Sequence, residues 1–185
     1  MSNVHQHHSL FIPPSTQDHR QGTLSATVNL VMYGDYQCSQ SADAYRLIKV
    51  IKQQLSILFG EEYLCFIFRH FPQVQIHSYA QRAAETAEAA ADQNQFWQMH
   101  DILLNHQQTL GDGYLVEYAN ELKLDTCQFL QAMSKHVHLE RIKQDIANGE
   151  QSGVVTTPAL FINGTRYCDL WKIQLLTAAI IAASH

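Results

Sequence analysis

The chain has 185 residues, of which 46% are hydrophobic and 16% are charged, a composition typical of a globular protein that can bury a core. Its formal net charge of −5 argues against nucleic acid as a partner, because phosphate binding favours a basic surface. No apolar run is long enough to span a membrane and no secretory signal opens the chain, so we expect a cytoplasmic protein without a membrane partner.

Residues 1–22 are polar, contain several histidines and prolines, and show no periodicity, which predicts a loosely held, flexible arm. His5, His7 and His8 lie close together in this arm, but a solvated arm offers no fixed geometry for a metal ion. The four cysteines also lack the paired spacing of a zinc site: Cys38, Cys65, Cys127 and Cys168. We therefore expect no metal site.

A strand–helix–strand unit is predicted next. Residues 28–33 are apolar on both faces, as in a central strand that is covered on both sides. From Ser41 onward apolar residues recur at helical spacing, and Gly60 ends this helix. The helical face that we expect to be buried consists of Ala44, Ile48, Ile51, Leu55 and Leu58. Residues 64–68 form a second apolar strand, which should run parallel to the first.

A block of short helices follows these strands. Residues 78–92 are rich in alanine, a strong helix former, and a second helix is predicted around Phe96. Asp112 and Asp125 are placed to cap two further helices. A last helical segment of the block is predicted to end at Gly149. Short sequential helices of this kind should form one compact cluster.

Strand chemistry returns after the helical block. Asn163 and Gly164 lie between two apolar segments, which is a strong signal for the turn of a β-hairpin. Asp169 is predicted to begin the last helix. The apolar face of that helix consists of Leu175, Leu176, Ala179 and Ile180. The full order is therefore strand, helix, strand, helical block, hairpin and helix.

This order, with Cys38 after the first strand and Thr157-Pro158 before the hairpin, resembles the DsbA-like branch of the thioredoxin superfamily. Similar phrases include VMYGDYQCSQS, FWQMHDILLNHQQTL and SGVVTTPALFINGTRY, and the resemblance extends from about Asp18 to the C-terminus. It implies an α/β, thioredoxin-like fold with a helical domain inserted between the second strand and the hairpin. The implied organisation is an arm over 1–22, the two halves of the thioredoxin-like domain over 23–77 and 151–185, and the helical insertion over 78–150.

The resemblance also implies thiol–disulfide exchange. Cys38 matches the family's nucleophile, and Thr157 and Pro158 match the threonine and cis-proline that face it. The backbone of Thr157 would then pair with an extended substrate, and Tyr36 and Gln37, beside the nucleophile, would contact it. Cys38 begins a predicted helix, whose unpaired N–H groups and dipole stabilise the reactive thiolate.

Two positions depart from the family pattern. Ser41 stands where the family carries its second, resolving cysteine, and Met32 stands where many members carry a buried acid that helps to move protons. Ser41 cannot form a disulfide; either its hydroxyl points at the Cys38 sulfur one helical turn away and assists catalysis, or it simply helps to begin the helix. Met32 removes the proton carrier and otherwise fills space in the core.

The remaining cysteines and histidines are predicted to be structural. Cys65 lies in an apolar strand and should be buried and inert, and Cys127 should pack inward from a helix. Cys168 ends the hairpin, where it is expected to be exposed and too far from Cys38 to resolve a disulfide there. Three histidines within the family-like phrases are expected to be packing or surface residues: His70, His77 and His100.

Three functions remain open from the sequence. The favoured one is a monothiol thiol–disulfide oxidoreductase or isomerase without a bound cofactor, in which an external thiol such as glutathione resolves Cys38. Its partners would be cysteine-containing proteins or small thiols. The second is a redox-inactive member that binds a peptide or protein in the groove beside Pro158. The third is a glutathione-dependent transferase or isomerase in which Ser39 or Ser41 holds the glutathione thiol.

Overall fold

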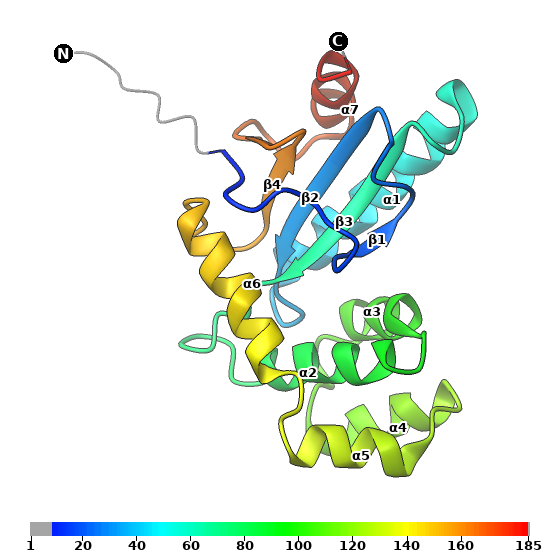
Figure 1. Ribbon diagram of the computed structural model, residues 1–185, viewed down its shortest axis with the longest axis vertical. Helices are drawn as coiled ribbons and strands as arrows, with labels where there is room; N and C mark the ends of the chain where they lie inside the picture. Colours follow the sequence, from blue (N-terminus) through cyan, green and yellow to red (C-terminus); the bar gives the residue numbers. More distant parts are fainter. Residues whose placement is uncertain (1–8, 185) are drawn as a thin grey trace, which may run out of the picture.

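The computed structural model describes residues 9–184, which form one five-stranded sheet in the order β1-β3-β2-β4-β5 (Figure 1). The strands are β1 (His19–Gln21), β2 (Val28–Gly34), β3 (Leu64–His70), β4 (Ala159–Ile162) and β5 (Thr165–Arg166). The helices are α1 (Ser39–Phe59), α2 (Ala80–Ala91), α3 (Phe96–Asn105), α4 (Asp112–Glu121), α5 (Thr126–Ser134), α6 (Leu139–Gln151) and α7 (Ile173–Ala182). The predicted α/β, thioredoxin-like fold with a helical insertion is confirmed.

The centre of the sheet follows the predicted strand–helix–strand pattern. β2 pairs parallel with β3 and antiparallel with β4. Leu30 and Met32 point to the core shared with α1 and α7, whereas Val31 and Tyr33 point to the opposite face, which α6 helps to cover. Alternate residues of one strand therefore feed two cores, as expected of a central strand.

The first helix agrees with the sequence except at its end. Cys38 is the N-cap of α1 and Gly60 is its C-cap, and the predicted face is buried from Ala44 to Leu55. Leu58 was also expected to be buried, but its side chain is 68% exposed. The last turn of α1 projects past the end of the sheet (Figure 1).

The helical cluster of α2 to α5 lies beyond the ends at which β2 and β3 terminate (Figure 1). Asp125 caps α5 as predicted, because its carboxylate accepts from the N–H of Gln128 at 2.9 Å. The prediction for Asp112 is wrong, since Gly111 is the N-cap of α4 and Asp112 lies in the first turn. The domain boundaries at residues 78 and 150 stay predictions.

The sequence placed the end of α6 too early, at Gly149. α6 continues to Gln151, and Gly149 is buried inside it. A Cβ at this position would lie 2.8 Å from the Phe71 ring and 3.0 Å from the Tyr33 ring. Glycine is therefore required here so that α6 can approach these aromatic rings closely, and it does not end the helix.

The C-terminal hairpin is confirmed, with Asn163 and Gly164 between β4 and β5. The last helix begins at Ile173 and not at Asp169. The hydroxyl of Tyr167 donates to the carbonyl of Leu170 at 2.8 Å and holds the intervening residues outside the helix. Leu175, expected on the buried face of α7, is 44% exposed.

The prediction of a loosely held arm over residues 1–22 is wrong for its described part. β1 pairs antiparallel with β3, and the buried Arg69 side chain binds Asp18 through Nε at 2.7 Å and Nη2 at 3.1 Å. Arg69 also donates to the carbonyls of Ile12 at 2.8 Å and Pro13 at 3.1 Å. A buried guanidinium thus fixes this segment to the sheet, while the N-terminal histidines predicted to be solvated lie outside the described residues.

Between residues 9 and 184, every helix is too short or too polar to cross a bilayer.

Candidate active site

Cys38 lies where β2 gives way to α1. Its backbone N–H donates to the carbonyl of Asp35 at 3.1 Å, and its own carbonyl accepts from Ser41 and Ala42 in the first turn. The sulfur therefore lies at the N-terminal end of a 21-residue helix, where the dipole favours an anion. The side chain is 6% exposed, and the thiol donates to the carbonyl of Thr157 at 3.5 Å.

Thr157 and Pro158 face Cys38 across the site, in the arrangement expected from the sequence. The Thr157–Pro158 peptide bond is cis, and Thr157 is buried. A groove of about 580 Å³ runs beside these residues, and Ala44, Leu47 and Trp171 supply its apolar walls. The fold thus brings together one thiol, a backbone segment and a groove of the size that binds ligands.

Ser41 is fully buried, and its hydroxyl accepts from the N–H of Asp35 at 3.2 Å. The expectation that this hydroxyl points at the Cys38 sulfur is wrong, because within residues 9–184 the sulfur's hydrogen-bond partner is the Thr157 carbonyl. Ser41 therefore closes the turn that precedes α1, which is the simpler role foreseen for it. A hydroxyl at the start of a helix commonly serves this purpose.

Tyr36 does not reach the groove, so the prediction that it contacts substrate is wrong. Its ring is 1% exposed and its hydroxyl lies 2.8 Å from Nδ1 of His100 in the core. An apolar environment favours an aromatic ring whose hydroxyl finds one buried partner. Gln37 is half-buried, and its side-chain carbonyl accepts from the N–H of Tyr79 at 2.8 Å. A substrate contact of Gln37 stays a prediction.

Three site residues were missed in the sequence, and Asp35 is the first of them. Its carboxylate is buried, and Oδ1 accepts from the N–H of Gln37 at 2.8 Å. Oδ2 accepts from the N–H of Gln73 at 2.8 Å and lies 2.8 Å from Nδ1 of His77. Three groups of the site loops are thus organised around one carboxylate, and His77 is a site residue and not mere packing.

Gln73 joins this carboxylate to the opposite wall of the site. Its side-chain carbonyl accepts from the N–H of Thr157 at 3.3 Å and from the Thr157 hydroxyl at 3.0 Å. Its amide donates to the carbonyl of Val155 at 3.4 Å. A closed series of hydrogen bonds therefore runs from Cys38 through Asp35, Gln73 and Thr157 back to the sulfur.

The other positions singled out in the sequence divide between core and surface. Met32 is fully buried in the core, as expected of a space-filling methionine. Cys65 is buried as predicted, and desolvation raises the pKa of its thiol. Cys127 is exposed, so the prediction that it packs inward is wrong; the first turn of α5 turns this residue to solvent. Cys168 is exposed, as expected.

Three side chains with metal-ligating atoms, His19, His70 and Glu88, meet in one cluster. His19 Nε2, His70 Nε2 and Arg141 Nε lie 2.8, 2.8 and 2.7 Å from the same carboxylate oxygen. Burial alone would raise the pKa of Glu88, but the hydrogen bonds from the two histidines hold it well below its usual range. Because a guanidinium already neutralises this carboxylate, the cluster fits a structural network better than a cation site.

Because His100 is buried, we expect acid to lower the free energy of unfolding. Desolvation holds its pKa well below the usual value of about 6.5, so below that pH the unfolded chain binds a proton that the folded chain does not. The free energy of unfolding should therefore fall as pH drops from 7.5 to 5.5, by at most about 1.4 kcal/mol per pH unit from this group. Urea unfolding of wild type and His100→Gln at both pH values tests this; an equally steep fall in the variant would contradict it.

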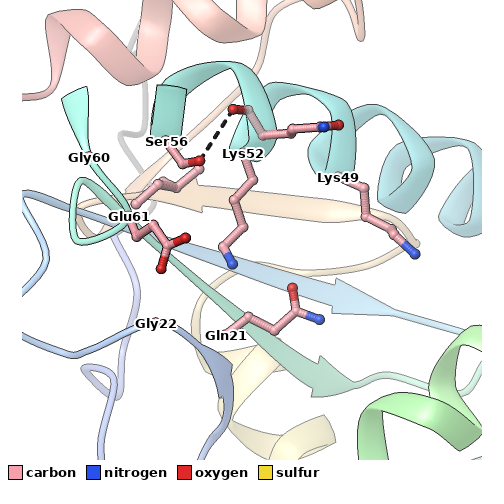
Figure 2. Close-up of a pocket in the computed structure, with 9 residues that line it drawn as sticks. Gln21, Gly22, Lys49, Lys52, Ser56, Gly60 and Glu61 are labelled. Carbon is pink, nitrogen blue, oxygen red and sulfur yellow. Dashed lines mark hydrogen bonds between the residues drawn. The ribbon is translucent and has the colours of Figure 1, made fainter. Parts of the chain in front are cut away.

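A second cavity, of about 390 Å³, opens between α1 and β1 (Figure 2). Lys52 extends across it toward Gln21, and Lys49 binds Asp101 at 3.1 Å. Ser56, on its wall, follows Cys38 by 18 residues, which corresponds to about 27 Å along a helix. This cavity therefore plays no part in the chemistry of Cys38.

A family model described as thioredoxin matches residues 15–181. The chain is 36% identical over 167 residues to the Na(+)/H(+) antiporter NhaA 3 of Salinispora tropica. This match covers 90% of this chain and 25% of that protein. It is 31% identical over 166 residues to the Na(+)/H(+) antiporter NhaA of Herminiimonas arsenicoxydans. The chain spans about a quarter of the length of the curated relatives it matches.

Solved structures share the fold. BdbD of Bacillus subtilis superposes with a TM-score of 0.76 at 19% identity, over 95% of this chain and 98% of that one. α-DsbA1 of Wolbachia pipientis superposes with a TM-score of 0.77 at 19% identity, over 92% of each chain. MdbA of Corynebacterium diphtheriae, a thiol-disulfide oxidoreductase, superposes with a TM-score of 0.66 at 15% identity, over 86% of this chain and 85% of that one. At such identities the likeness concerns the fold alone.

Proposed function

Because the chain belongs to the thioredoxin family, we propose that it is a thiol–disulfide oxidoreductase or isomerase that works through the single thiol of Cys38. The observation that carries the proposal is the contact of the Cys38 sulfur, at the N-terminus of α1, with the carbonyl of Thr157 at 3.5 Å. A thiol at a helix start is activated as a nucleophile, and the facing backbone offers a surface for an extended substrate.

The proposed cycle has two balanced exchange steps. The Cys38 thiolate attacks a disulfide RS–SR′, forms the mixed disulfide Cys38–S–SR and releases R′S⁻. A second thiolate R″S⁻ then attacks the sulfur of R, forms RS–SR″ and restores the Cys38 thiolate. Each step breaks one S–S bond and forms another, while one thiolate enters and one leaves. Electrons and charge therefore balance without an electron carrier or a metal. Since Ser41 cannot supply the second thiolate, we propose a small external thiol such as glutathione.

The environment of the site supports this assignment of partners. The groove beside Pro158 has apolar walls from Leu47 and Trp171, which suits a cysteine-containing polypeptide, while the thiol itself suits a small disulfide. All four cysteines are free thiols, and two of them are exposed. Exposed free thiols persist in a reducing compartment, so we propose the cytoplasm as the site of action.

Oxidised glutathione should modify Cys38 selectively at neutral pH. The exposed Cys127 and Cys168 would compete, so the experiment uses the Cys127→Ser/Cys168→Ser variant, in which only Cys38 and the buried Cys65 remain. We expect one glutathione per chain by mass spectrometry, mapped to Cys38, and none after the further change Cys38→Ser. A Cys38 that stays unmodified while free cysteine of equal concentration reacts would refute the proposal.

A redox-inactive binding protein is the second candidate. It is favoured by two observations: Cys38 is only 6% exposed, and Ser41 and Met32 both depart from the pattern of a dithiol enzyme. A protein with this function would still bind its peptide or protein partner in the groove after the change Cys38→Ser. The transferase alternative has less support, because the hydroxyl of Ser41 is buried and bound to the backbone of Asp35, which leaves Ser39 as the exposed serine.

A further inference from the structure

The backbone beside the cis-proline is already occupied by a side chain of the same protein. The amide of Gln73 donates to the carbonyl of Val155 at 3.4 Å, and its carbonyl accepts from the N–H of Thr157 at 3.3 Å. We propose that the Gln73 side chain takes the place of one peptide unit of an extended substrate and thereby makes Cys38 favour small disulfides over polypeptides. This inference rests on the function proposed above.

The chemistry of an amide explains how the Gln73 side chain can take the place of a peptide unit of the substrate. A residue of a bound strand recognises a neighbouring backbone by one N–H donor and one C=O acceptor. The Gln73 side chain presents the same donor and acceptor to Val155 and Thr157. As long as it does so, the N–H of Thr157 is not available to a substrate backbone.

The backbone of Gln73 cannot move away with its side chain. Its N–H donates to Oδ2 of Asp35 at 2.8 Å, and Asp35 is buried and held by His77. A substrate can therefore reach Thr157 only if the side chain of Gln73 rotates. Such a rotation is local: it breaks the hydrogen bonds from Thr157, including that of its hydroxyl at 3.0 Å, but leaves those to the Asp35 carboxylate intact.

The two backbone hydrogen bonds of Gln73 are weak enough to be displaced. Their lengths of 3.3 and 3.4 Å exceed the usual value of about 2.9 Å. Gln73 is also partly exposed, so water can solvate the amide once it is released. Exchange of weak hydrogen bonds of this kind corresponds to a rate penalty of about 5- to 10-fold for polypeptides.

An apolar surface surrounds Gln73, and it suits a polypeptide more than a small thiol. Val74 is 46% exposed, Ile76 is 70% exposed and Val155 is 79% exposed. Exposed apolar side chains that gather around a reactive group indicate a site that receives apolar segments. A small disulfide without peptide groups needs access to the sulfur alone and has no N–H or C=O to pair with the backbone of Thr157.

The test compares two disulfides in the Cys127→Ser/Cys168→Ser background. One is bis(2-hydroxyethyl) disulfide, which carries no peptide group; the other is an extended apolar peptide whose single cysteine is joined to 2-mercaptoethanol. Replacing Gln73 with alanine should raise the rate of Cys38 modification by the peptide, relative to the rate with bis(2-hydroxyethyl) disulfide, about 5- to 10-fold. Gln75→Ala is the matched control, because Gln75 is exposed on the same loop and its side chain forms no hydrogen bond within the described residues.

The outcomes separate this inference from the proposed function. A Gln73→Ala variant with an unchanged ratio of the two rates, or with both rates lowered, would overturn the role of Gln73 while Cys38 remains an active thiol. A wild-type protein that reacts with neither disulfide would instead overturn the proposed function. A rise of the peptide rate in Gln75→Ala equal to that in Gln73→Ala would also contradict the inference, since loop composition alone would then explain it.

Discussion

Replacing Ser41 with cysteine is expected to free Cys38 from its dependence on an external thiol. Residue 41 lies one helical turn after the nucleophile, so a thiol there that turns from the Asp35 N–H toward Cys38 attacks the mixed disulfide intramolecularly. Intramolecular attack commonly exceeds attack by a dilute external thiol by far more than 100-fold, and we expect release of bound glutathione to accelerate by at least about 100-fold. The hydrogen bond from Asp35 N–H to the Ser41 hydroxyl is lost, at a cost of about 1 kcal/mol.

The measurement follows release of glutathione from modified Cys38 without added thiol. Ser39→Cys is the matched control, because residue 39 is exposed and lies next to Cys38 in sequence but not one turn away. It should accelerate release much less than Ser41→Cys. If the two cysteine variants release glutathione equally fast, the geometry of α1 does not determine resolution and our account of Ser41 is incorrect.

Replacing Arg69 with methionine is expected to destabilise the protein by about 3–5 kcal/mol, because a buried charge loses its partner. The side chains of Arg69 and Asp18 are 3% and 8% exposed, and two hydrogen bonds join them. The guanidinium also satisfies the carbonyls of Ile12 and Pro13, which would lose their donor. The loss should free the segment before β1 and weaken the edge of the sheet.

Urea unfolding measures this change in the free energy of unfolding. Arg46→Met is the control, since Arg46 forms an exposed pair with Asp43 whose loss should cost about 1 kcal/mol or less. The double variant Arg69→Met/Asp18→Asn should recover part of the loss, because no buried charge is then left unpaired. A loss at Arg69 no larger than that at Arg46 would show that the ion pair does not hold the N-terminal segment.

Most of the fold was predictable because its signals are local. The alternation of residues in β2, the helical spacing in α1, and the turn at Asn163 and Gly164 each lie within a few neighbouring residues. The errors arose where a distant partner decides the outcome. Gly149 was expected to end a helix but is required by Phe71, which lies 78 positions earlier in the chain.

The site was predictable only in part, for the same reason. Cys38 stands out because a cysteine between a strand and a helix is a strong local pattern, and the resemblance supplied Thr157 and Pro158. Nothing near Asp35 in sequence indicates that its carboxylate binds Gln73 and His77, residues 38 and 42 positions away. Tyr36 shows the opposite error, since its position beside the nucleophile suggested a role that its buried ring excludes.

The series of hydrogen bonds around Cys38 also has a consequence for biosynthesis. Cys38 and Thr157 are separated by 119 positions, so on the ribosome the nucleophile is made long before the segment that covers it. Contacts of such large sequence separation form late, after most of the chain has closed on itself. Until then the thiol of a nascent chain has neither the Thr157 carbonyl to accept its hydrogen bond nor the shielding of the folded site. The same thiol is therefore open to disulfides during translation and only 6% exposed once the chain has folded.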